Sequence, residues 1–202
     1  MNRHSTIPSI AASPRDCALA FRAALFLSAL ALLPLVSRAQ QDRPTEYQVK
    51  AAYLFNFSRF VSWPSGPSSA VSRPFSICVL GRDPFGPILD ATVAGERIGG
   101  RNVVVRRISQ PAQAVDCRVL FISSSEDSRL KDILAALDKF TVLTVSDIPG
   151  FNEHGGMIEF VLQGDRVRFA VNLDSASEAR LTFSSNLLKV AVAVRGNQPR
   201  GE

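Results

Sequence analysis

Histidine is almost missing from this chain of 202 residues, which has only His4 and His154. Cysteine is also scarce, with Cys17, Cys78 and Cys117. No C-x-x-C pair and no Cys/His cluster occurs, and a structural zinc site needs four such ligands. The sequence also lacks the glycine-rich motifs of nucleotide sites and the G-x-S-x-G element of hydrolases. These absences predict that the chain holds no metal and no cofactor, and they disfavour a serine hydrolase.

The first 39 residues have the pattern of a cleaved secretory signal. Arginines precede an apolar run from Ala23 to Val36, and Ser37-Arg38-Ala39 places small side chains where a signal peptidase cuts. The run is short for a membrane span. We therefore predict cleavage after Ala39 and export, with an uncleaved N-terminal anchor as the alternative.

Cleavage changes the charge balance of the chain. Residues 1–39 hold four Arg and one Asp, so the remainder keeps 19 Lys and Arg against 17 Asp and Glu, a net charge of +2. The whole chain carries +5. A charge this close to zero gives no reason to expect nucleic acid as a partner. We predict a signal at 1–39, a linker at 40–46, one domain at 47–194 and a flexible tail at 195–202.

Strands and helices are predicted to alternate along the middle of the chain. Strands are expected at 75–81, 102–108, 117–123 and 141–147, and helices at 84–92 and 126–140. This order predicts an α/β fold, compact and three-layered, with a mainly parallel sheet and helices on both faces. A C-terminal β-hairpin is expected over 157–163 and 166–172, followed by helices at 172–180 and 184–194.

The chain is expected to open with an aromatic helix over 44–62. Apolar residues recur there at spacings of three and four, which predicts one buried face. That face would hold Val49, Ala52, Tyr53, Phe57, Phe60 and Val61.

Cys78 and Cys117 both remain after cleavage, and each lies in or beside an apolar strand. An isolated pair in an oxidising compartment is expected to form a disulfide. Neighbouring strands bring Cα atoms within bonding reach. Two buried free thiols are the alternative.

Two strand ends form the candidate ligand loops. Arg82 and Asp83 follow the first strand, and Ser123 and Ser124 follow the third. Ligands of open α/β sheets bind beyond the carboxyl ends of the strands. The alternative is that these residues only cap turns and helices.

His154 lies in the segment FNEHGG (151–156), beside Glu153 and two glycines. A catalytic or metal-binding histidine needs a nucleophile or further ligands at a matched spacing, and none is near in sequence. The remaining interpretations are a mobile loop before the hairpin and a loop that contacts a partner.

The chain resembles the YfiR-like periplasmic family over nearly all of 47–191. The resemblance rests on six segments in order: YQVKAAYLFNFSRFVSWP (47–64), FSICVLGRDPFG (75–86), CRVLFIS (117–123), LTVSDIPGF (143–151), GGMIEF (155–160) and VRFAVNLDSASEARLTFSSNLLKVA (167–191).

The resemblance implies a periplasmic α/β regulator that is not an enzyme and does not span the membrane after cleavage. In the family's best-known member, the domain represses a membrane diguanylate cyclase by contact with its periplasmic region, which links it to cyclic-di-GMP and biofilm control. Cys78 and Cys117 match a bridged pair of that member. A second bridge of that member lies near the GGM segment, where this chain has no cysteine. Relatives can form homodimers.

Candidate partner contacts are aromatic residues of the opening helix and residues of the FNEHGG loop, namely Phe55, Phe57, Phe60, Trp63, Phe151 and His154. The alternative function is a periplasmic domain that senses a small ligand and has no cyclase partner.

Overall fold

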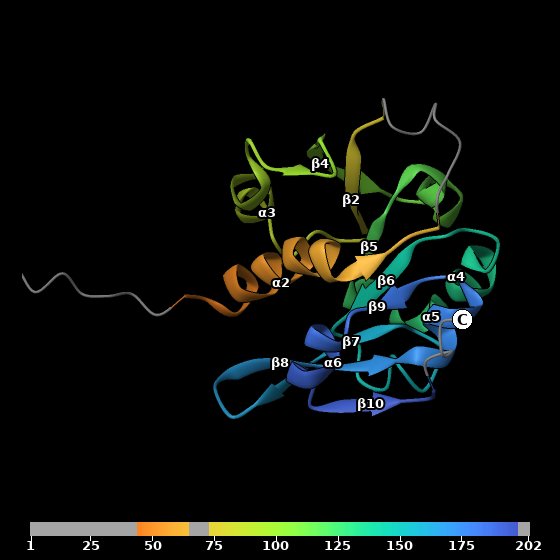
Figure 1. Ribbon diagram of the computed structural model, residues 1–202. Helices are drawn as coiled ribbons and strands as arrows, with labels where there is room; N and C mark the ends of the chain where they lie inside the picture. Colours follow the sequence, from red (N-terminus) through yellow and green to blue (C-terminus); the bar gives the residue numbers. More distant parts are fainter. Residues whose placement is uncertain (1–43, 65–72, 198–202) are drawn as a thin grey trace, which may run out of the picture. The chain divides into compact units, whose positions relative to one another are not determined.

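The computed structural model describes residues 44–64 and 73–197 (Figure 1). The chain divides into two units, Met1–Asp42 and Arg43–Glu202, and the described residues all belong to the second. The predicted signal segment and its cleavage site lie outside the described residues. Within the described ranges, no helix is long and apolar enough to cross a membrane.

Most helices and strands follow the order that the sequence predicts, and the short strands at 61–62, 182–183 and 193–195 are additional. The helices are α2 (Glu46–Phe60), α3 (Pro87–Val93), α4 (Leu130–Leu137), α5 (Leu173–Glu178) and α6 (Ser185–Val190), with 3-10 turns η2 (Pro111–Asp116) and η3 (Ser124–Arg129). The strands are β1 (Val61–Ser62), β2 (Phe75–Leu80), β3 (Arg97–Ile98), β4 (Arg101–Ile108), β5 (Val119–Ile122), β6 (Leu143–Ser146), β7 (Ile158–Gln163), β8 (Arg166–Asn172), β9 (Thr182–Phe183) and β10 (Ala193–Arg195).

Eight of these strands form one mixed, mostly parallel sheet that curls into a half-barrel, in the order β10-β8-β7-β6-β5-β2-β4-β3 (Figure 1). Neighbours from β7 to β4 pair in parallel, whereas β8 pairs with β7 and β3 with β4 in antiparallel fashion. The predictions of an α/β fold, a mainly parallel sheet and a C-terminal hairpin are confirmed.

The two faces of the sheet build two separate cores. Because side chains alternate along a strand, Ile77 and Val79 of β2 pack with residues of α2 and α3, whereas Cys78 and Leu80 pack with residues of α4 and η2. Helices thus cover both faces of the central strands. The predicted three-layer arrangement describes the structure only in part, because the sheet is curled and mixed.

Helix α2 buries the predicted face only in part: Phe57 and Val61 are buried as expected, and Tyr53 packs against the core. Ala52 and Phe60 were expected in the core and are exposed, whereas Lys50, Ala51 and Leu54 are buried. The helix contacts α3, α6, β5 and β8. A helix covered on several sides has no single apolar stripe, so the periodicity indicates its orientation only in part.

Other helices are also shorter than predicted, and the one expected over 126–140 forms α4 only over Leu130–Leu137, after the 3-10 turn η3. The helix expected from 84 begins at Pro87, because Asp83 Oδ1 accepts the N–H of Phe85 at 2.8 Å and shapes a turn first. The helix expected over 184–194 ends at Val190. The residues after it, Ala193–Arg195, instead form the edge strand β10, parallel to β8. Alternating valines favour a strand there.

The disulfide prediction is confirmed. Cys78 in the middle of β2 is bonded to Cys117, which follows η2, and their Cα atoms are 5.9 Å apart. Both cysteines are buried in the core on the α4 side of the sheet. The bridge therefore fixes η2 and the start of β5 against β2.

Candidate functional site

The carboxyl ends of three parallel strands meet at one edge of the sheet. Leu80 of β2 is in register with Ile122 of β5, and Ile122 with Ser146 of β6. The residues that follow these strands therefore lie side by side. They are Gly81 and Arg82, Ser123 and Ser124, and Asp147. This edge is where open α/β sheets bind ligands.

Arg82 and Asp83 take different positions at this edge. Arg82 is exposed, and its backbone N–H donates to Ser125 Oγ at 2.9 Å. The carboxylate of Asp83 accepts from Phe85 N and, at 2.9 Å, from Arg107 Nε. Asp83 thus serves a turn and an ion pair, as the capping alternative expects.

Ser123 and its neighbours close the edge beside Arg82. Ser123 caps η3, with its Oγ accepting the N–H of Ser125 at 3.3 Å. Gly81 has φ +90, and a Cβ there would lie 2.5 Å from Glu126 Oε1. The loops after β2 and β5 therefore interlock and leave little space between them. Ser124 instead lines a cavity beside Lys50 and Asp147.

The most strongly organised group at this edge surrounds Lys50, which is only 3% exposed. Its ammonium group donates to Asp147 Oδ2 at 2.6 Å and forms a second ion pair with Glu46. The hydroxyl of Tyr47 donates to the same Asp147 oxygen at 3.2 Å. The ammonium group also lies 4.6 Å from the centre of the Tyr47 ring. Helix α2 and the end of β6 are joined by these contacts.

A cavity of about 400 Å³ opens beside this group. Its walls include Lys50, Asp147, Ser124, Glu159 and Phe160. Asp147 Oδ1 is buried and has no hydrogen-bond partner among the described residues. A buried acceptor without a partner is costly, so a ligand with an amine or a hydroxyl group would gain a hydrogen bond there.

Hydrogen bonds and nearby charges favour the protonated forms of Lys50 and Tyr47. Burial opposes the charge of Lys50, but hydrogen bonds to Asp147 and Glu46 outweigh it, and the pKa of Lys50 is raised above its ordinary 10.5. Burial and then the charge of Asp147 raise the pKa of Tyr47 above 10.0. Lys50 is therefore a cation and Tyr47 a neutral donor.

We expect the free energy of unfolding to fall as the pH rises above about 10. Both pKa values are raised by folding, so their stabilisation is complete below the ordinary values and is lost as the pH passes through the raised ones. Urea unfolding across this pH range measures the free energy. Tyrosinate absorbance of the folded protein measures the ionisation of Tyr47 and Tyr53, the two tyrosines of the chain. The difference between wild type and Tyr47→Phe assigns the ionisation of Tyr47. A pKa of Tyr47 at or below 10.0 would contradict the expectation.

The loop between β6 and β7 is held by Glu159 of β7. Its carboxylate accepts the backbone N–H of Gly150 at 3.0 Å and that of Asn152 at 3.1 Å. Phe151 is fully buried against Gly156, where a Cβ would lie 2.1 Å from the ring. These contacts tie the loop to β7 and to the buried ring of Phe151, with no disulfide in the loop.

His154 is exposed on this loop. Its Nδ1 lies 2.8 Å from the carbonyl oxygen of Gly150, which accepts a hydrogen bond from it. Within residues 44–64 and 73–197, no group of three or more His, Cys, Asp or Glu side chains is placed to hold a metal ion. The contacts of His154 are those of a turn.

The predicted partner contacts divide by exposure. Phe55, Phe57 and Phe151 are buried and have almost no surface to present. Phe60 is 39% exposed at the end of α2. Trp63 is half-buried, with its ring 5.5 Å from that of Phe75.

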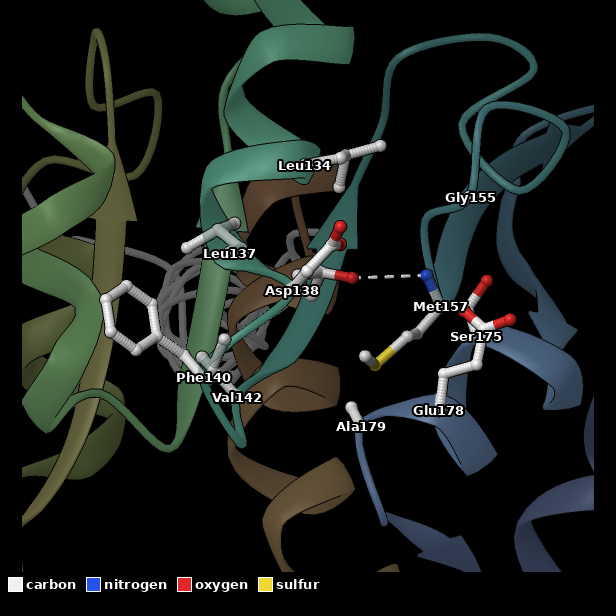
Figure 2. Close-up of a pocket in the computed structure, with 11 residues that line it drawn as sticks. Leu134, Leu137, Asp138, Phe140, Val142, Gly155, Met157, Ser175, Glu178 and Ala179 are labelled. Carbon is white, nitrogen blue, oxygen red and sulfur yellow. Dashed lines mark hydrogen bonds between the residues drawn. The ribbon is translucent and has the colours of Figure 1, made fainter.

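A second cavity, of about 300 Å³, lies between α4 and α5 (Figure 2). Apolar side chains of Leu134, Leu137 and Met157 form part of its lining, and the carboxylates of Asp138 and Glu178 add negative charge. The dashed line in Figure 2 marks the hydrogen bond from Met157 N to Thr144 Oγ1, 3.2 Å long. Such a lining suits a ligand with a cationic group.

Three residues of the strand-end group were missed by the sequence analysis: Lys50, Asp147 and Glu159. Asp147 follows a buried strand just as Arg82 and Ser123 do, so the same rule applied to β6 would have found it. Lys50 lies inside the YQVKAAYLF segment that carries the resemblance. Nothing in the local sequence indicates Glu159, because its partners Gly150 and Asn152 belong to a turn.

The structure defines a small α/β domain with polar groups gathered at the carboxyl edge of its parallel strands. The chain belongs to the YfiR/HmsC-like family, whose model matches residues 47–192. This confirms the resemblance and covers all elements from α2 to α6.

The solved structures that are similar to the chain include the following two. One is a conserved domain protein from Vibrio cholerae O1 biovar El Tor, with a TM-score of 0.54 and 11% identity over 75% of this chain and 60% of that one. This likeness concerns the fold alone, and the chain spans less than two thirds of that protein. The other is the ABC domain in complex with L-Trp from Streptococcus pneumonia, with a TM-score of 0.45 and 12% identity over 59% of this chain and 55% of that one.

Proposed function

We propose that this protein is a periplasmic negative regulator that binds the periplasmic domain of a membrane-bound signalling enzyme, a diguanylate cyclase. Membership of the YfiR/HmsC-like family over 47–192 carries the proposal. The Cys78–Cys117 bridge supports an oxidising compartment, and the signal pattern of residues 1–39 supports export. In this proposal the chain itself catalyses no reaction.

Repression would work by differential binding. A regulator that binds only the inactive conformation of the receptor shifts the population toward that conformation. The catalytic event then takes place on another chain, across the membrane. For this mechanism the regulator needs a surface that fits the receptor. The β6–β7 loop, which is held by hydrogen bonds to Glu159, is one candidate for such a surface.

The end of α2 supports a contact surface of this kind. Phe60 is 39% exposed, and Trp63, three residues later, is half-buried. Between them lies β1, which pairs with β9. Aromatic residues that are partly exposed are enriched in the energetic centres of protein interfaces. His154 on the β6–β7 loop remains a separate candidate contact.

We expect the immobilised exported protein to capture a receptor with a diguanylate cyclase domain from solubilised membranes. Deletion of the gene should raise cyclic-di-GMP and surface attachment. Phe60→Asp should weaken capture about tenfold or more, because a charge replaces an aromatic contact. Val115→Asp is the matched control, since Val115 is 62% exposed on η2, away from this surface.

Capture that is equally strong with Phe60→Asp would exclude the end of α2 as the contact. Unchanged cyclic-di-GMP after deletion, together with no cyclase among the captured proteins, would contradict the proposed function. Urea unfolding of both variants shows whether each is folded in these experiments.

The cavity beside Lys50 favours a second candidate function, the sensing of a small ligand. Its volume of about 400 Å³ is in the range of small-molecule sites. The unpartnered Asp147 Oδ1 would orient a donor group. A melting temperature that rises with a ligand and no longer rises in Asp147→Asn would support this function.

A further inference from the structure

A pocket of about 410 Å³ lies at the amino-terminal edge of the parallel strands, away from the group around Lys50. Arg101 is the first residue of β4, and Arg118 directly precedes β5. Lys139 and Phe140 follow α4, and Val115 belongs to η2. All five line the pocket, together with Cys117 of the disulfide.

Positive charge in this pocket exceeds negative charge. Its lining includes Arg73, Arg101, Arg118 and Lys139, but only one carboxylate, that of Asp116. Asp116 is already paired, with Arg73 at 2.6 Å and with Arg106 at 4.0 Å. Among the described residues, no carboxylate forms an ion pair with the other three cations.

The uncompensated positive charge also affects Arg118. Burial, and then the positive charge of Arg101, lower the pKa of Arg118. The charged form of this guanidinium is therefore less stable in the pocket than in water. A bound anion would remove the repulsion between Arg101 and Arg118 and compensate the burial of charge.

Aromatic rings position two of the cations before any anion arrives. The Arg101 guanidinium lies 5.3 Å from the centre of the Phe75 ring, and the Lys139 ammonium lies 5.6 Å from that of Phe140. The disulfide holds Cys117, the residue before Arg118, against β2. Groups that are already placed lose less freedom on binding.

We propose that this pocket binds the phosphate group of a small molecule. Two guanidinium groups recognise phosphate through paired N–H donors, a geometry that lysine alone does not provide. The volume of the pocket leaves room for the rest of a small ligand, which would contact Val115 and Phe140. The site would act independently of any cyclase partner.

The test is titration of the purified exported protein with inorganic phosphate, at an ionic strength kept constant with chloride. Calorimetry and broadening of the ³¹P resonance report binding, and the melting temperature is expected to rise with phosphate. Arg118→Gln should weaken phosphate binding about tenfold or more, because it removes charged hydrogen bonds. In chloride alone this variant should melt no lower than wild type, since the repulsion is gone.

Arg195→Gln is the matched control, because it removes the same charge from the exposed strand β10, and it should bind phosphate like wild type. Arg101→Gln provides a second variant of the pocket, and it too should bind more weakly. The proposal is overturned if chloride reproduces the effect of phosphate, or if both pocket variants bind as tightly as wild type.

Discussion

Replacing Lys50 by methionine is expected to lower the free energy of unfolding by about 3–5 kcal/mol. Lys50 is 3% exposed, and the side chain of Asp147 is 12% exposed. Removal of the cation leaves a buried carboxylate whose one remaining partner among the described residues is the Tyr47 hydroxyl. Urea unfolding followed by the fluorescence of Trp63, the single tryptophan, measures the loss.

Two further variants separate the buried pair from ordinary surface charge. Lys50→Met with Asp147→Val removes both charges, and it should recover much of the loss because apolar residues can replace a buried pair. Arg59→Met, on the same helix, breaks the exposed Arg59–Glu96 pair and should cost less than about 1 kcal/mol. A loss of that small size in Lys50→Met would contradict the burial argument.

The double replacement Cys78→Ala and Cys117→Ala is expected to lower the free energy of unfolding by about 4 kcal/mol. The bridge joins residues 39 positions apart and so restricts the unfolded chain over that length. The same urea experiment measures the loss, and reduction of the wild type with dithiothreitol should reproduce it.

Thiol titration provides the check on this second result. The denatured, unreduced exported protein should contain no free thiol, since the pair is bonded. Two reactive thiols, or a double variant as stable as wild type, would show that the bridge does not form or does not stabilise the fold.

The strands of the sheet were predictable from sequence because they are buried on both faces. FSICVL in β2 and VLFI in β5 are continuous apolar runs, and every residue in them is buried. Such runs are typical of parallel strands covered by helices. The disulfide was predictable because Cys78 and Cys117 are the two cysteines left after the predicted cleavage, and each lies in or beside one of these runs.

The strand-end site could be predicted only in its location. The residues after β2 and β5 were expected at one edge of the sheet, and the register places them there. Their hydrogen bonds could not be foreseen, and Ser123 and Asp83 turn out to cap local structure. Lys50 was missed because a lysine on a helix is normally exposed, and its partner Asp147 lies 97 residues away.

The short ribbon of β1 and β9 bears on how the chain can fold as it is made. Val61 of β1 pairs with Phe183 of β9, and the Phe57 ring packs 5.0 Å from that of Phe169. Helix α2 can pack against α3 and β5 early, but its contacts with β8 and α6 form only after the last part of the domain has emerged from the ribosome or a translocation pore. Until then the side of α2 that carries Tyr53 and Phe57 lacks its partner Phe169, and the native packing of that side has to wait for the end of the domain.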